Sequence, residues 1–489
     1  MTMSRILPGP LLSGIAALAL IAGGAYAMTG TPEEPGTGSS DWAPRDKVTI
    51  EHPEWSKDAI LYQINTRQFT PEGTFKAAQA ELPRLKALGV DILWLMPIHP
   101  IGEENRKGTL GSPYAVKDYY AVNPEFGTEA DFKAFVDAAH AQGFHVILDL
   151  VANHTAWDNP LASEHPDWYE KSWDGQFRPT PWWDWTDIID LDWSKPGVRE
   201  HVGGAMEKWV RDFGVDGFRA DVAGYIPLDF WETMRTRLKA IRPVFMLGEV
   251  QQTAFHFAAF DATYAWDWHN TAKKVALGEA DPTAFYGYYA ENESLWPRSA
   301  MRMTYIENHD SNAWEGTVEE NYGANLEPIT VLSFMGEGIP LVYNGMEACN
   351  VKRLEFFEKD PIDWNKGESC TYGALLRDLI AFRKANPALA NGQWGARMVK
   401  VETDVPQKIF AWVRQEGSDK VLALFNFAAA PVTATFADAL PASTYREFGK
   451  DESVTVKPGD AMTVPAHGYR LLSTDTARSS APPIMREEG

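Results

Sequence analysis

Short apolar runs alternate with amphipathic segments from residue 58 to residue 390, and this alternation constrains the fold more than any other feature of the chain. A run such as 144–150, apolar almost throughout, is typical of a strand buried on both faces of a parallel sheet. Eight strands in such an alternation predict an α/β fold, a closed (β/α)8 TIM barrel. The expected strands are 59–64, 91–95, 144–150, 215–220, 244–247, 262–264, 301–306 and 339–343, and the expected helices are 75–88, 132–142, 197–213, 228–241 and 372–385.

Two stretches depart from the alternation. The residues between the third strand and the helix at 197 are rich in Trp, Asp and Pro and are too many for an ordinary connection, so a protruding loop subdomain is expected there. After residue 391, β-type runs separated by turn residues predict a C-terminal antiparallel β-sandwich. The predicted units are the barrel at 55–390 with its insertion at 153–196, the sandwich at 391–476 and a tail at 477–489.

The first 27 residues have the pattern of an export signal. Arg5 precedes an apolar run at 11–22, and Ala25-Tyr26-Ala27 has the small-x-small form of a signal peptidase site. The apolar run is shorter than the roughly 20 residues that span a bilayer, so cleavage after Ala27 is expected, with an uncleaved anchor as the alternative. Residues 28–54 then form a linker rich in Pro, Gly, Ser and Thr. We expect an exported protein, periplasmic or secreted, with no stable membrane partner.

Composition excludes some partners and leaves other questions open. The chain has 45 Lys and Arg against 67 Asp and Glu, a formal net charge of −22, and no basic stripe, which argues against nucleic acid. Aromatic residues make up 12% of the chain, which suits either a surface that stacks sugar rings or an aromatic core. Cys349 and Cys370 are either a disulfide or two buried thiols.

Polar residues stand at the ends of several predicted strands, where barrel enzymes carry their chemistry. Arg219 and Asp221 lie two residues apart at the end of the fourth strand, so both side chains point to one face. Each of these residues alone is more often a helix cap or a structural side chain than a catalytic one. Three carboxylates and two histidines at one rim instead predict catalysis: Asp221, Glu249 after the fifth strand, Asp310 and His309 after the seventh, and His154 after the third.

This set suits glycoside cleavage with retention, which needs one carboxylate nucleophile and one carboxylic acid that donates a proton. Arg219 is expected to keep Asp221 ionised, as a nucleophile requires. Burial and nearby negative charge are expected to keep Glu249 protonated, as a donor requires. Asp310 supplies further negative charge and binds substrate hydroxyls. The chain has no phosphate loop, dinucleotide fingerprint or serine nucleophile elbow, so no cofactor is expected for the chemistry.

Four segments resemble the signature regions of the α-amylase family, glycoside hydrolase family 13, in order and spacing: 149–154, 217–221, 248–249 and 308–310. The resemblance covers residues 55–475. It implies that Asp221 is the nucleophile, Glu249 the acid/base and Asp310 the transition-state stabiliser. It further implies that His154 and His309 bind sugar in subsite −1, that Arg219 orients the nucleophile, and that Tyr114 is the stacking residue of subsite −1, for which loop packing is the alternative.

Other positions depart from the family pattern. Residues 222–227 replace the Lys-His that follows the nucleophile in many amylases, and resemble neopullulanase-like, maltodextrin-acting members. Tyr225 is therefore expected either to stack on the acceptor sugar or to pack behind its loop. Asn153 and Asp190 match two ligands of the family's calcium ion, but a third ligand position falls at Tyr225, so no metal ligand is assigned and a structural Ca2+ stays open. The tryptophans of 181–185 form either a stacking wall or a small core.

Together these features predict an exported hydrolase that cleaves α-1,4-glucosidic bonds of starch and maltodextrins by a retaining double displacement. One alternative is a transglycosylase or isomerase of the same family, such as a 4-α-glucanotransferase or a trehalose synthase-like enzyme. Another is a non-catalytic glucan-binding or transporter-associated homologue. The complete set of Asp221, Glu249 and Asp310 argues against this last alternative.

Overall fold

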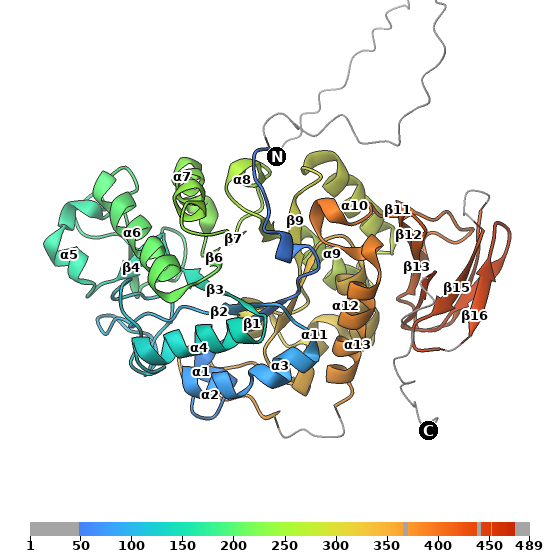
Figure 1. Ribbon diagram of the computed structural model, residues 1–489, viewed down its shortest axis with the longest axis horizontal. Coiled ribbons are helices and arrows are strands. Elements are labelled where there is room, and N and C mark those ends of the chain that lie inside the picture. Colours follow the sequence, from blue (N-terminus) through green and yellow to red (C-terminus); the bar gives the residue numbers. More distant parts are fainter. Residues whose placement is uncertain (1–47, 365–369, 438–441, 451, 475–489) are drawn as a thin grey trace, which may run out of the picture. The chain divides into compact units, whose positions relative to one another are not determined.

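A computed structural model describes residues 48–364, 370–437, 442–450 and 452–474. The predicted signal at 1–27, most of the linker and the tail at 477–489 lie outside these residues. Eight parallel strands close into a barrel in the order β1-β10-β9-β8-β7-β6-β3-β2, with helices outside it (Figure 1). The predicted TIM barrel is therefore confirmed. Its strands are β1 (Leu61–Ile64), β2 (Ile92–Leu95), β3 (His145–Leu150), β6 (Gly217–Ala220), β7 (Phe245–Gly248), β8 (Ala262–Tyr264), β9 (Met301–Thr304) and β10 (Ile339–Tyr343).

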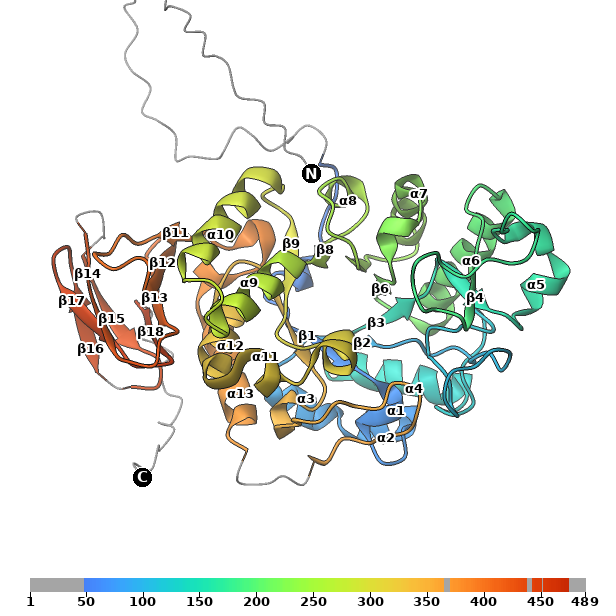
Figure 2. The same cartoon turned by 180° about the vertical axis from the view of Figure 1, so that it is seen from behind.

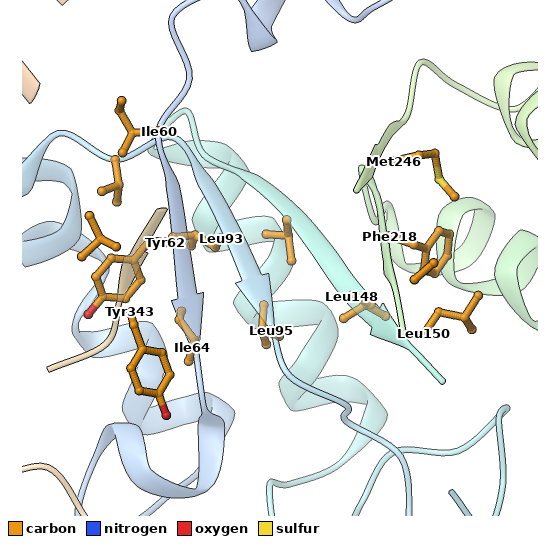
Figure 3. Packing of buried hydrophobic residues seen from close by; sticks show 14 of the residues in the cluster. Ile60, Tyr62, Ile64, Leu93, Leu95, Leu148, Leu150, Phe218, Met246 and Tyr343 are labelled. Carbon is orange, nitrogen blue, oxygen red and sulfur yellow. The ribbon is translucent and has the colours of Figure 1, made fainter. Parts of the chain in front are cut away.

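Alternate residues of each strand face the two sides of the barrel wall. Leu61, on β1, belongs to a cluster inside the barrel, together with Trp94 and Phe245. Its neighbours Ile60 and Tyr62 belong to the larger cluster between strands and helices (Figure 3). All five are buried, which explains why these strands have apolar residues at nearly every position.

The helices differ from the predicted ones in two instructive places. The segment 75–88 is two helices, α2 (Phe75–Ala80) and α3 (Leu82–Leu88), because Pro83 has no backbone N–H to continue the first. α4 (Glu129–Ala141) begins three residues earlier than expected, because Thr128 and Asp131 form a capping box. The remaining barrel helices are α1 (Thr66–Phe69), α6 (Pro196–Phe213), α7 (Leu228–Lys239), α8 (Phe255–Ala258), α9 (Trp266–Ala276), α10 (Thr283–Leu295), α11 (Val318–Tyr322), α12 (Leu326–Met335) and α13 (Tyr372–Ala385).

The chain between β3 and α6 forms the expected insertion. It contains a two-stranded antiparallel sheet, β4 (His154–Ala156) and β5 (Ile188–Asp190), and the short helix α5 (Pro160–Glu164). The register of this sheet pairs His154 with Asp190. The insertion is therefore anchored next to the end of β3, at the rim where the predicted catalytic residues lie.

After α13 the chain forms antiparallel strands, which Figure 2 shows from behind in orange and red. Six of them form one sheet and two form a second, and apolar side chains of both sheets share one core. The predicted C-terminal β domain is confirmed. The large sheet has the order β11 (Val399–Lys400), β12 (Ile409–Glu416), β13 (Asp419–Asn426), β18 (Gly468–Ser473), β15 (Ser443–Glu447), β16 (Ser453–Val456), and the small one pairs β14 (Val432–Thr435) with β17 (Ala461–Val464).

A disulfide joins Cys349, after β10, to Cys370, before α13, with 5.7 Å between their Cα atoms. Of the two expectations for the cysteines, the disulfide is therefore confirmed and two buried thiols are excluded. Within the described residues, no helix has both the length and the apolar character needed to span a membrane.

Candidate active site

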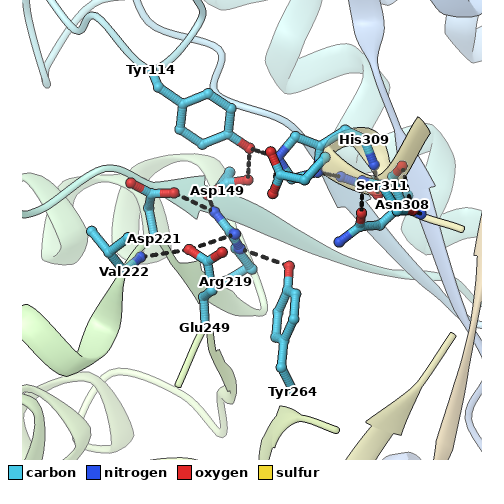
Figure 4. Close-up of polar contacts among 12 residues, drawn as sticks. Tyr114, Asp149, Arg219, Asp221, Val222, Glu249, Tyr264, Asn308, His309 and Ser311 are labelled. Carbon is cyan, nitrogen blue, oxygen red and sulfur yellow. Dashed lines mark hydrogen bonds and ion pairs between the residues drawn. The ribbon is translucent and has the colours of Figure 1, made fainter. Parts of the chain in front are cut away.

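The guanidinium of Arg219, on β6, lies at the centre of the rim and is completely buried (Figure 4). Its Nη1 donates to Asp149 at 2.9 Å and to Asp221 at 2.8 Å. Its Nη2 forms an ion pair with Glu249 Oε2 at 2.9 Å. These contacts follow from the barrel order, because β3, β6 and β7 are neighbours and their carboxyl ends meet at one edge.

The three carboxyl groups around Arg219 differ in access to solvent. The side chains of Asp221 and Glu249 are 10% and 14% exposed, whereas that of Asp149 is not exposed. Asp149 is also covered by Trp94, whose Nε1 donates to its Oδ2 at 3.1 Å. A ligand entering the rim can therefore contact Asp221 and Glu249, while Asp149 stays behind them.

Burial dominates the electrostatics of this cluster. It raises the pKa of Asp149 to about 6, although Arg219 and the Tyr114 hydroxyl lower it. It also raises the pKa of Asp221 well above its usual range; Arg219 opposes this, and Glu249 and Asp149 add to it. The raised pKa of Asp221 runs against the expectation that Arg219 keeps this carboxyl group ionised, because one cation faces three carboxylates out of water. The directions of both shifts favour a proton shared within this cluster in the free protein.

The backbone just after Asp221 holds Glu249 in place. Val222 has φ 35° and ψ 46°, a left-handed conformation that β-branched residues rarely adopt. In this turn the Val222 N–H donates to Glu249 Oε2 at 2.7 Å. Sequence reasoning missed this contact, because a backbone donor leaves no mark in the residue types.

His309 joins the rim from the segment after β9. Gln63, on β1, donates from Nε2 to His309 Nδ1 at 2.7 Å and accepts the His309 backbone N–H at 3.3 Å. This arrangement assigns the ring proton to Nε2, which lies 2.6 Å from the Tyr114 hydroxyl and 3.3 Å from Asp310 Oδ2. Burial lowers the pKa of His309 well below its usual value, and Arg219 adds to this, so the ring is neutral. Gln63 is a further site residue that the sequence reasoning did not identify.

Tyr114 connects His309 to the Arg219 cluster. Its hydroxyl donates to Asp149 Oδ2 at 2.9 Å, and its ring stacks on that of His309 at 5.4 Å between centroids. The ring of Phe356, which the sequence reasoning also missed, lies nearly parallel to both, 6.2 Å from Tyr114 and 6.4 Å from His309 between centroids. Tyr114 is thus part of the rim and does more than pack a loop.

His154 lies beside the same residues, on β4. It is buried, which lowers its pKa to about 4, and it hydrogen-bonds the backbone of Tyr114. Its ring lies 6.0 Å from that of Trp185. All seven predicted site residues therefore converge at one rim, and their individual roles remain predictions.

The residues matched to the family's calcium ligands bind one another. Asp190 Oδ1 accepts the Asn153 amide at 3.0 Å and the hydroxyl of Thr180. The Asn153 amide and the Thr180 hydroxyl thus both donate to Asp190 Oδ1, an oxygen that a bound cation would need. Asp190 is the single carboxylate among these three residues. The described residues contain no group of three or more His, Cys, Asp or Glu side chains placed to hold a metal. Calcium takes six to eight oxygen ligands, so Asn153 and Asp190 could provide only part of a site, and a structural Ca2+ stays a prediction.

The aromatic loop of the insertion is largely open to solvent. Trp182 is fully exposed and Trp183 is 55% exposed, so the interpretation as a small core is wrong for these two residues. Tyr225, which follows β6, is 51% exposed. The indole of Trp183 donates to the Tyr225 hydroxyl at 3.1 Å and stacks on Trp185 at 5.4 Å. Tyr225 does not pack behind its loop.

Comparisons with known proteins show what the chain as a whole is similar to. A family model described as "Alpha amylase, catalytic domain" matches residues 46–372. The chain is 29% identical to Alpha-amylase MalA of Haloarcula japonica over 442 residues, which are 85% of this chain and 63% of that protein. It thus spans less than two thirds of that relative.

Two further comparisons cover a transferase and a solved structure. The chain is 29% identical to the Alpha-1,4-glucan:maltose-1-phosphate maltosyltransferase of Bifidobacterium longum, over 65% of this chain and 45% of that protein. The maltogenic alpha-amylase AmyB of Thermotoga neapolitana superposes with a TM-score of 0.77 and 30% identity, over 85% of this chain and 98% of AmyB. The resemblance expected from the four sequence segments is confirmed: the chain belongs to the alpha-amylase family.

Proposed function

We propose that this protein hydrolyses α-1,4-glucosidic bonds of starch-derived glucans with retention at the anomeric carbon. Asp221 is the nucleophile, Glu249 the acid and base, and Asp310 the transition-state stabiliser. One observation carries the proposal: Asp221 and Glu249 are held by one buried guanidinium and both are open to a ligand, whereas Asp149 is closed. Retention requires two adjacent carboxyl groups, one ionised and one that carries a proton.

The contacts of the two carboxyl groups suggest how the oxygens divide their tasks. Arg219 occupies Oδ1 of Asp221, which leaves Oδ2 to attack the anomeric carbon. Arg219 and the Val222 N–H both occupy Oε2 of Glu249, which leaves Oε1 to carry the proton. In the first step Oδ2 bonds to the anomeric carbon while the leaving oxygen takes the proton from Glu249. In the second step Glu249 deprotonates a water that displaces Asp221.

The remaining residues suit binding of the sugar ring next to the bond that breaks. The Tyr114 ring, backed by His309 and Phe356, offers a flat apolar surface. The side chain of Asp310 is 41% exposed, so it can accept hydroxyl donors and place negative charge beside an oxocarbenium-like centre. The proposed chemistry uses α-glucan as its only partner and needs no cofactor.

Glycosyl transfer is the second candidate, because water and a sugar acceptor compete for the same covalent intermediate. The exposed pair of Trp183 and Tyr225 favours it, since aromatic rings stack on acceptor sugars. The name of the Bifidobacterium longum relative describes a maltosyltransferase, which supports keeping this candidate. The three carboxylates at the rim argue against the non-catalytic alternative.

We also propose that the protein is exported, with cleavage after Ala27. The Cys349–Cys370 disulfide supports this, because disulfides persist in oxidising compartments.

The roles of the carboxyl groups predict large losses of activity. Asp221→Asn and Glu249→Gln should each lower kcat on maltoheptaose by several orders of magnitude and leave the circular dichroism spectrum unchanged. Asp184→Asn, which changes an exposed carboxylate of the insertion, should keep full activity. NMR of the first product should show the α-anomer. A β-anomer formed first would contradict the assignment of Asp221.

The shared proton predicts a shift in pH dependence. Asp149→Asn removes one negative charge from the cluster, so the remaining carboxyl groups hold their proton less tightly and lose it at lower pH. The alkaline limb of kcat/KM should therefore move to lower pH by roughly one unit.

A second buried carboxyl group provides the control for this experiment. Burial raises the pKa of Glu307 to about 7, and its carboxylate accepts from Asn312, so it too could titrate in this range. Glu307→Gln should leave the limb in place. A limb that moves in Glu307→Gln and stays in Asp149→Asn would show that the Arg219 cluster does not hold the titrating proton.

The exposed Tyr225 ring predicts a change in product partition. Tyr225→Ala should raise the ratio of hydrolysis to transfer on maltotriose, because an acceptor sugar loses its stacking surface and water does not. Trp182→Ala, which removes a fully exposed ring of the neighbouring insertion, should leave the ratio unchanged. An unchanged ratio in Tyr225→Ala would exclude Tyr225 from the acceptor site. Glucose and maltose are the expected main products.

The export proposal predicts the N-terminus of the mature protein. Sequencing of the periplasmic or secreted protein should begin at Met28. An intact Met1 in the membrane fraction would instead show that residues 1–27 are an anchor.

A further inference from the structure

An exposed aromatic cluster lies beside the proposed sugar site, and the proposed reaction steps leave most of it unused. Trp314 follows β9 and is 57% exposed, and the half-buried Phe356 and Phe357 follow β10. The ring of Trp314 lies 5.3 Å from that of Phe356 and 6.1 Å from that of Phe357 between centroids. Several apolar rings gathered at the surface indicate a binding site, whereas single exposed apolar side chains are ordinary.

Contacts on both sides of Trp314 hold the turn that carries it. Asn312, in the same turn, accepts the Leu354 N–H at 2.9 Å, which ties the turn to the segment that carries the two phenylalanines. Glu315, directly after Trp314, pairs with Lys273 of α9 at 2.8 Å. The neighbours of Trp314 are therefore anchored while its ring stays in solvent. A surface fixed in this way loses little conformational freedom when a ligand stacks on it.

The cluster continues the aromatic surface of the proposed sugar site. Phe356 lies nearly parallel to both Tyr114 and His309, at 6.2 Å and 6.4 Å between centroids, and it is also the nearer neighbour of Trp314. The turn that carries Trp314 begins directly after Asp310. A glucan bound on the Tyr114 surface therefore has Trp314 within reach of its next ring.

The barrel order separates this cluster from the proposed acceptor residues. In the closed order of eight strands, β10 stands opposite β6, and β9 stands opposite β3. Tyr225 follows β6, and Trp183 belongs to the insertion after β3. Glu249, which protonates the leaving sugar in the proposed reaction, is held by the turn after β6. The leaving sugar thus belongs on the side of Tyr225, and the retained part of the glucan belongs on the side of Trp314.

We propose that Trp314 stacks on the second glucosyl ring of the retained part of the substrate, so that the enzyme prefers a maltosyl unit to a single glucosyl unit there. This inference rests on the proposed function and adds the length of the retained unit. The flat apolar face of a glucose ring suits an exposed indole, and Phe356 and Phe357 support that indole from beside it. Trp314 acts on the second ring and leaves the chemistry at the first ring unchanged.

Two glycosyl fluorides test this preference on the full-length protein. α-Maltosyl fluoride and α-glucosyl fluoride differ only in the second ring, and their leaving group needs no acceptor-side sugar. Trp314→Ala should lower kcat/KM for α-maltosyl fluoride by about tenfold or more and keep that for α-glucosyl fluoride within about twofold. Trp314→Phe should keep most of the activity on α-maltosyl fluoride. Trp173→Ala, which removes a fully exposed ring of the insertion, should change neither rate.

Equal losses on the two fluorides would overturn the proposal, because Trp314 would then act only by positioning Asp310. Unchanged rates on both fluorides would overturn it as well. Calorimetric titration with maltotriose separates this inference from the proposed function, because binding needs no turnover. In the Asp221→Asn background, Trp314→Ala should weaken maltotriose binding about tenfold, even if neither fluoride is hydrolysed. Equal binding with and without the Trp314 ring would contradict the proposal.

Discussion

The buried guanidinium of Arg219 is the contact on which the arrangement of the rim depends. It binds Asp149, Asp221 and Glu249, which come from three neighbouring strands, and it is completely shielded from water. The ring of Trp94 lies 5.2 Å from it inside the barrel. Removing one partner from such a buried group leaves uncompensated charge, at a cost of about 3–5 kcal/mol. The cluster therefore fixes the positions of Asp221 and Glu249 before any ligand arrives.

The barrel separates this cluster from the parts of the chain that provide stability. Strands that are largely apolar on both faces form a rigid wall, and Asp149, Asp221 and Glu249 lie at or just after the ends of β3, β6 and β7. The insertion after β3 adds exposed aromatic rings at the rim, including Trp183, whose indole donates to the hydroxyl of Tyr225 after β6.

Much of this arrangement could be predicted from sequence, because apolar runs locate strands and strand ends locate the rim. The split between α2 and α3 was not predicted, although the sequence indicates it, since Pro83 cannot continue a helix. The contacts of Gln63 and Phe356 could not be predicted from sequence, because they depend on which distant segments the fold brings together. The proton shared around Arg219 was missed for a related reason: burial acts on the whole cluster, whereas sequence reasoning considered the residues in pairs.

The central claim is that Arg219 presents Asp221, and no other carboxylate, to the anomeric carbon. Trapping of the covalent intermediate tests it most directly, with a 5-fluoro glucosyl fluoride that forms the ester faster than water releases it. Proteolysis and mass spectrometry then locate the sugar. The account predicts a single labelled peptide with the glucosyl group on Asp221. A label on Asp149, Glu249 or Asp310, or an active enzyme that forms no ester, would contradict it.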